Sequence, residues 1–67
     1  MPKITLEAAR VNAGMSQTEA AKAIGVSRAT ISNWEKGKTS PTGKMQSVIS
    51  EAYNIPIDYI DFTTFFN

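Results

Sequence analysis

The sequence predicts an all-α fold, a compact bundle of five short helices in one domain that spans residues 1–67. Three observations lead to this prediction. A length of 67 residues is enough for one domain and no more. Serine and threonine residues stand where helices would begin, and glycines stand where they would end. Within the segments bounded in this way, apolar residues recur at the spacing of a helical face.

Capping residues define the first two helices. Thr5 is a suitable cap for a helix over residues 6–12. Ser16, followed three residues later by Glu19, forms a capping box that starts the second helix, and Gly25 ends it. The expected inner faces contain small and aliphatic side chains: Leu6, Ala9 and Ala13 in the first helix, and Ala20, Ala21 and Ile24 in the second.

Three further helices are expected. Ser27 caps the third, which ends at Gly37. The fourth covers about residues 42–53, and Pro56, whose missing N–H is not needed at a helix start, begins a fifth over residues 57–61. The inner face of the fourth helix repeats at i, i+3, i+4 and i+7: Met45, Val48, Ile49 and Ala52.

The composition argues against several classes of function. The chain has no cysteine and no histidine, which excludes disulfides, thiol or imidazole metal sites, and catalysis by Cys/His or Ser/His pairs. The acidic residues are scattered singly, without metal-loop spacing. We therefore expect no enzyme, no metal and no cofactor. No apolar run approaches the roughly 18 residues of a membrane span, and no signal-peptide core is evident. A cytoplasmic protein without a membrane partner or an evident small-molecule ligand is expected.

The charges are distributed unevenly along the chain. Residues 22–50 contain five cationic side chains and one acid, whereas residues 51–67 contain three acids and no cationic side chain. This asymmetry indicates an anionic partner that meets one face of the protein. A solvated surface of uneven sign would give the same composition, so charge alone leaves both readings open.

The segment from Gln17 to Gly37 has the most specific spacing in the chain. Two helices of about eight residues, joined by a short turn that contains Gly25, are typical of a helix-turn-helix, in which the second helix crosses the first steeply. Val26, Ile31 and Trp34 are expected to hold the second helix to the body. At about 100° per residue, the opposite side carries Arg28, Ala29, Ser32, Asn33 and Lys36.

Those outward side chains suit double-stranded DNA. The narrow polar helix fits a major groove about 12 Å wide, where Arg28 can donate to guanine O6 and N7, and Asn33 can pair with adenine N6 and N7. Ser32 can read either kind of base, and the Ala29 methyl group can touch a thymine methyl. Backbone phosphates are expected to meet a second set of residues: Gln17, Lys36, Lys38, Thr39 and Lys44.

The stretch SQTEAAKAIGVSRATISNWEKGKTSP resembles the helix-turn-helix of the Cro/C1-type repressors, the XRE family of bacterial and phage transcription regulators. ISEAYNIPIDYI resembles the part of that family that leads into its fifth helix, so the resemblance covers about residues 5–60. It implies a five-helix bundle of the lambda-repressor-like type, a homodimer on operator DNA, and base reading by the third helix at four positions: Arg28, Ala29, Ser32 and Asn33.

The resemblance also implies an ion pair between Arg10 and Glu35, which we expect to tie the first helix to the third. The sequence departs from the family pattern in two places. Ala20 stands where leucine is common, which makes a small core smaller, and the chain after Ile60 has no counterpart.

Aromatic residues are concentrated at the C-terminal end. Tyr53 and Tyr59 are assigned to packing. Phe62, Phe65 and Phe66, in an aromatic tail over residues 61–67, would together expose more apolar surface than a small monomer normally shows. They either fold back on the core or form a dimer contact, and we predict the dimer contact.

Three hypotheses for function follow. The first is a sequence-specific transcription regulator, a repressor that binds palindromic operator DNA as a homodimer. The second is a protein-interaction module, such as an antitoxin or an anti-repressor target. The third is the DNA-binding part of a longer repressor, which the aromatic tail argues against because linkers are usually polar.

Overall fold

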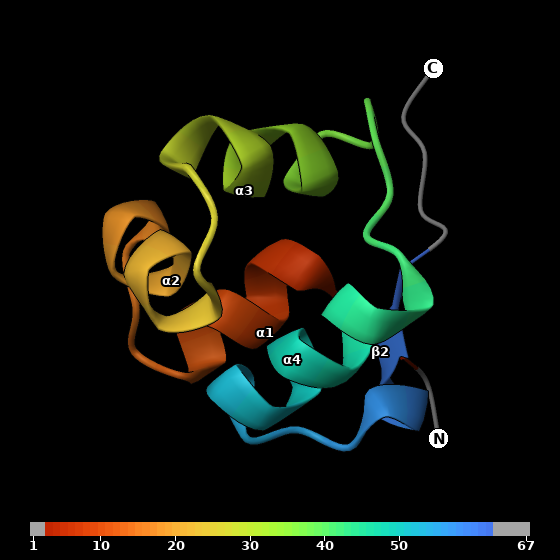
Figure 1. Ribbon diagram of the computed structural model, residues 1–67. Helices are drawn as coiled ribbons and strands as arrows, with labels where there is room; N and C mark the ends of the chain where they lie inside the picture. Colours follow the sequence, from red (N-terminus) through yellow and green to blue (C-terminus); the bar gives the residue numbers. More distant parts are fainter. Residues whose placement is uncertain (1–2, 63–67) are drawn as a thin grey trace.

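The computed structural model describes residues 3–62 and has the predicted all-α architecture, with helices packed around one small core (Figure 1). In the view of Figure 1, α3 forms the upper edge, α1 and α4 lie beneath it, and α2 lies to the left. The elements of the described residues are β1 Ile4–Thr5, α1 Leu6–Asn12, α2 Gln17–Ile24, α3 Arg28–Glu35, α4 Gly43–Tyr53, the 3-10 helix η1 Ile57–Tyr59 and β2 Ile60–Asp61.

Each α-helix begins after a residue whose side chain accepts a hydrogen bond from the first turn, because the first N–H groups of a helix have no partner within it. These caps are Thr5, Ser16, Ser27 and Thr42. The predicted capping box is present in full: Ser16 Oγ accepts from Glu19 N at 3.1 Å, and Ser16 N donates to Glu19 Oε1 at 2.8 Å. Hydrogen bonds from the Ser16 backbone and hydroxyl lower the pKa of Glu19 below its ordinary value.

The prediction of a fifth helix over residues 57–61 is wrong. Pro56 does precede a helical turn, but this turn is the 3-10 helix Ile57–Tyr59, after which the chain becomes extended. Ile60 then pairs in parallel with Ile4. The reason is burial: the extended conformation places Ile60 in the core, where it is 1% exposed, beside Ile4 of the paired strand.

The core is built from the inner faces that the sequence predicts. Its largest fully buried side chains are those of Ile31, Ile49 and Ile60. The other buried residues of the core cluster are Leu6, Ala9, Ala20, Ala21, Ile24 and Tyr53. The prediction that Tyr53 packs in the core is therefore confirmed, whereas Tyr59 is 46% exposed and its assignment to packing is wrong.

Phe62 is half-buried and packs against the core of its own chain. Phe62 therefore folds back on the core of its own chain, and this is the alternative to the dimer contact that we predicted for it. Phe65 and Phe66 lie outside the described residues. In the described part of the chain, no helix has the length and apolar character that a membrane crossing requires.

Candidate nucleic-acid interface

α2 and α3 are joined by a tight turn at Gly25. The backbone there has φ of 91°, in the left-handed region that glycine adopts at little cost. Gly25 N and Val26 N both donate to Ala21 O, at 2.8 and 3.0 Å, which closes the end of α2. Ser27 then caps α3, so only two residues separate the cap from the last residue of α2. The turn therefore has the geometry of the predicted helix-turn-helix.

α3 has one side in the core and one side in solvent. Ile31 is 1% exposed, and Trp34 is half-buried against the core, which confirms the predicted attachment. Arg28 and Ala29 are exposed in the first turn. Ser32 and Asn33, one turn later, are half-buried. The four proposed base-reading residues therefore lie on the part of α3 that a partner can reach.

The carboxyl end of α3 is held by the predicted ion pair. Arg10 Nε donates to Glu35 Oε2 at 2.7 Å, and Arg10 Nη2 donates to Glu35 Oε1 at 3.3 Å. The two side chains are only 11% and 7% exposed. The hydrogen bond to Glu35 raises the pKa of Arg10 above its ordinary value. This buried pair joins α1 to the end of α3.

The same carboxylate has a further partner that the sequence did not predict. Gln17 Nε2 donates to Glu35 Oε1 at 3.0 Å, and Arg10 Nη1 donates to Met15 O at 2.8 Å. Met15 and Gln17 flank the cap of α2, so the ion pair holds the amino end of α2 as well. No spacing rule links residues 17 and 35, and only the packing of α2 against α3 brings them together.

The predicted phosphate-contacting lysines follow α3 on the same side of the protein. Lys36 and Lys38 are exposed, and Lys44 is exposed in the first turn of α4. The loop between these helices folds back on α3, because Lys38 N and Thr39 N donate to Asn33 O at 3.0 and 3.5 Å. It places Lys36 and Lys38 directly after the carboxyl end of α3.

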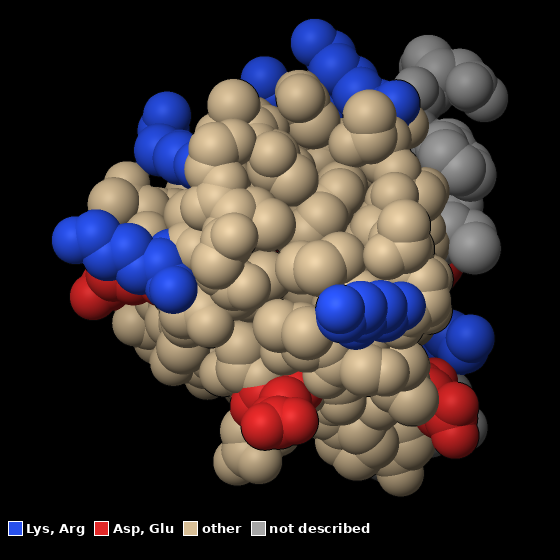
Figure 2. Space-filling model, viewed as in Figure 1, with Lys and Arg blue, Asp and Glu red and all other residues tan. Residues whose placement is uncertain are grey.

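The surface of this region has one sign. Residues 22–50 contain one acidic residue, Glu35, and its side chain is buried against Arg10. The exposed charged side chains of this segment are therefore all cationic. Figure 2 shows cationic side chains along the upper edge, over α3 and the loop that follows it, where no acid is visible; further down, cationic and acidic side chains are mixed. In the segment 22–50 the exposed charges are thus cationic, as the sequence predicts.

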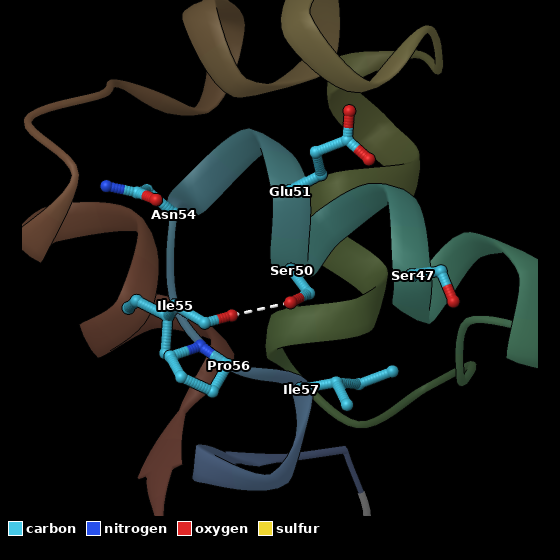
Figure 3. Close-up of a pocket in the computed structure, with 7 residues that line it drawn as sticks. All are labelled: Ser47, Ser50, Glu51, Asn54, Ile55, Pro56 and Ile57. Atoms are coloured by element: carbon cyan, nitrogen blue, oxygen red, sulfur yellow. Dashed lines mark hydrogen bonds between the residues drawn. The ribbon is translucent and has the colours of Figure 1, made fainter.

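A hollow of about 440 Å³ lies at the other end of the molecule, between the end of α4 and η1 (Figure 3). Ser50 Oγ donates to Ile55 O at 2.5 Å and is thereby occupied. Figure 3 shows the Glu51 and Asn54 side chains pointing away from Ser50 and Ile57, so the polar groups do not converge on a ligand position.

Comparison with known proteins gives one match. Residues 6–60, which include the four α-helices of the described part of the chain, match the sequence model of a family described as helix-turn-helix. Comparisons with curated proteins and with solved structures find no match.

Proposed function

The chain belongs to the XRE, or Cro/C1-type, helix-turn-helix family of DNA-binding transcription regulators, and we propose that it is a repressor that occupies a palindromic operator as a homodimer. One observation carries the proposal: α3 is attached to the core through Ile31 and Trp34, while its other side presents base-reading chemistry to solvent.

The proposed reading surface consists of Arg28, Ala29, Ser32 and Asn33. Arg28 stands in the first turn of α3, at the end that enters the groove in this class of motif, and donates to guanine. Asn33 contacts adenine, Ser32 contacts either kind of base, and the Ala29 methyl group meets a thymine methyl. The small side chain of Ala29 also lets the backbone of α3 approach the groove.

The proposed phosphate contacts flank that surface on both sides. Gln17 lies at the amino end of α2, where the helix dipole favours an anion. Lys36, Lys38, Thr39 and Lys44 lie beyond the carboxyl end of α3. The three lysines release counterions from DNA on binding, so for each tenfold rise in salt the logarithm of the affinity falls by about 0.9 for each phosphate that a lysine neutralises. Gln17 and Thr39 are neutral and add nothing to this slope.

A homodimer follows from the symmetry of the proposed operator, because two copies related by a two-fold axis place their α3 helices about 34 Å apart along one side of DNA. Apolar surface on the described residues supports self-association: Ile57 and Tyr59 of η1 are 38% and 46% exposed. The proposed aromatic contacts are Phe65 and Phe66, because Phe62 packs against the core of its own chain. Such a regulator acts in the cytoplasm, where it meets DNA.

Selection of bound duplexes from a random DNA pool tests the proposal. We expect a two-fold symmetric sequence whose half-sites are centred about one helical turn apart, or a multiple of it. Enrichment of a single half-site without a symmetric partner would contradict the homodimer. Failure to enrich any sequence, with binding that depends only on DNA length, would contradict sequence-specific regulation.

A further inference from the structure

Gln17 is held in place before any DNA arrives. Its carboxamide N–H donates to Glu35 Oε1 at 3.0 Å across 18 positions of sequence, and the side chain is half-buried. A carboxylate beside Arg10 only accepts hydrogen bonds, so the NH₂ group of the amide, and not its oxygen, faces Glu35. One of the two N–H donors of Gln17 is therefore occupied and the other is free.

The acceptor itself is fixed. Glu35 receives two hydrogen bonds from Arg10, at 2.7 and 3.3 Å, in addition to the one from Gln17. Its side chain is 7% exposed, and among the described residues no buried side-chain nitrogen or oxygen lacks a partner. A carboxylate with three donors around it has little freedom to rotate, so it fixes the orientation of the amide that it holds.

Arg10 neutralises the negative charge of Glu35, which would otherwise repel DNA phosphates. An unpaired Glu35 close to a phosphate would repel it, but the pair with Arg10 has no net charge. Arg10 also donates to Met15 O at 2.8 Å, directly before the cap of α2. The network therefore fixes the amino end of α2 relative to the carboxyl end of α3.

We infer that Glu35 is a positioning residue for DNA binding: it holds the Gln17 carboxamide so that the second N–H of this amide is set to donate to a DNA phosphate. The inference rests on the proposed function and assigns the ion pair a role beyond stability. A glutamine side chain that is ordered in advance loses less conformational entropy on binding. The register of the phosphate contact relative to α3 is fixed at the same time.

A double-mutant cycle tests this inference through the affinity for the selected DNA. Removing Glu35 alone would leave Arg10 as an unpaired buried charge, so both are replaced together by Arg10→Met with Glu35→Met, an apolar pair of similar size. Gln17→Met, which keeps the side-chain length, is measured in the wild type and in this background. Gln46→Met is the control, because Gln46 donates only to Pro41 O, at 3.3 Å.

In the wild type, Gln17→Met is expected to weaken binding about tenfold or more, as the loss of a hydrogen bond to a charged group does, and to leave the salt slope unchanged, because a neutral amide releases no counterion. The apolar pair alone is expected to weaken binding about three- to tenfold, the cost of ordering one long side chain. In the Arg10→Met, Glu35→Met background, Gln17→Met is expected to weaken binding three- to tenfold less than it does in the wild type. Equal effects of Gln17→Met in the two backgrounds would overturn the inference, as would an equal response to Gln46→Met.

A second measurement needs no change to the ion pair. In nuclear magnetic resonance spectra of the wild type, one Gln17 carboxamide proton is expected downfield of the other, and addition of the selected DNA shifts the second proton while the first stays. Movement of the first proton on DNA binding would overturn the inference. If the wild type binds no specific DNA at all, both the proposed function and the inference fail. If the wild type binds specific DNA but the double-mutant cycle shows no coupling, only the inference fails.

Discussion

α3 and α4 are both short amphipathic helices, but they are held in the protein in different ways. α4 has Ile49 and Tyr53 in the core, at 0% and 3% exposure, with more apolar residues half-buried beside them. α3 has a single buried residue, Ile31. The attachment of α3 is completed by polar contacts at its ends: the Gly25 turn on one side and the Arg10–Glu35 pair on the other.

The difference shows what a helix needs if one side is to remain available to a partner. Apolar residues added on the outer side of α3 for stability would replace the residues proposed to read bases. An ion pair at the end of the helix fixes its position without using that side. We therefore expect changes at the polar attachments to displace α3 and changes on its outer side to leave the fold intact.

The largest effect is expected from Arg10→Met, which leaves the Glu35 carboxylate buried without its partner. Loss of one member of a buried pair costs about 3–5 kcal/mol, a large part of the stability of a small domain. Chemical denaturation measures it. The double variant Arg10→Met with Glu35→Met is the control and should recover most of the loss. If the single variant is as stable as the wild type, α3 is held by its apolar contacts alone.

Tyr53 tests the attachment of α4 through pH. Burial, and to a lesser degree the negative charge of Glu35, raises the pKa of Tyr53 to about 12. An unfolded tyrosine ionises near pH 10, so between about pH 10 and 12 the folded state holds a proton that the unfolded state has lost. The free energy of unfolding should therefore fall in this range, by up to about 2 kcal/mol. Tyr53→Phe should remove this part of the pH dependence, and an identical alkaline profile in both proteins would contradict the account.

Gly25→Ala addresses the other polar attachment of α3. A Cβ at this position would meet nothing within 4 Å, so the cost is conformational and comes from φ of 91°. A non-glycine residue in the left-handed region costs about 1–2 kcal/mol. Gly43→Ala, in the first turn of α4, also has open space and no positive φ, and should not destabilise. Equal melting temperatures for the two variants would show that the turn does not constrain α3.

Ser16→Ala should cost about 1 kcal/mol, because it removes the cap of α2 and one half of the capping box. Glu19, the other half, has a lowered pKa in the folded protein. The contribution of Glu19 is therefore present above its ordinary pKa and is lost as the pH falls through its folded value. Thermal unfolding at neutral and acidic pH measures both effects. Ser16→Ala keeps the backbone N–H that is the main cause of the lowered pKa, so Glu19→Gln is the control for the pH effect: an unchanged pH dependence in Glu19→Gln would assign it to another carboxylate.

The parts of the fold that the sequence predicted correctly depend on local chemistry. Thr5, Ser16 and Ser27 cap α1, α2 and α3 as predicted, because a hydroxyl three positions before a backbone N–H acts within one turn. Thr42, expected as the first residue of the fourth helix, is the cap of α4. The end of the chain depends on a distant partner instead. Pro56 signals that a helix can start, but nothing in residues 57–61 shows that Ile60 pairs with Ile4.

The candidate site divides in the same way. Helical phase correctly placed Ile31 on the inner side of α3 and Arg28 on the outer side. The contact of Gln17 with Glu35 could not be predicted, because it depends on the angle between α2 and α3 and on the packing of Arg10 beneath them. A long-range contact of this kind leaves no periodic signal in the sequence.

The most direct test of the account is the double variant Arg28→Ala with Asn33→Ala, measured for both stability and affinity for the selected DNA. Surface changes away from caps and ion pairs alter stability by within about 0.5 kcal/mol, so the melting temperature should stay close to that of the wild type. Each lost base contact should weaken specific binding by about 1–3 kcal/mol, while binding to unrelated DNA stays the same. Unchanged specific affinity, or a loss of stability as large as that of Arg10→Met, would contradict the claim that the free side of α3 is the reading surface.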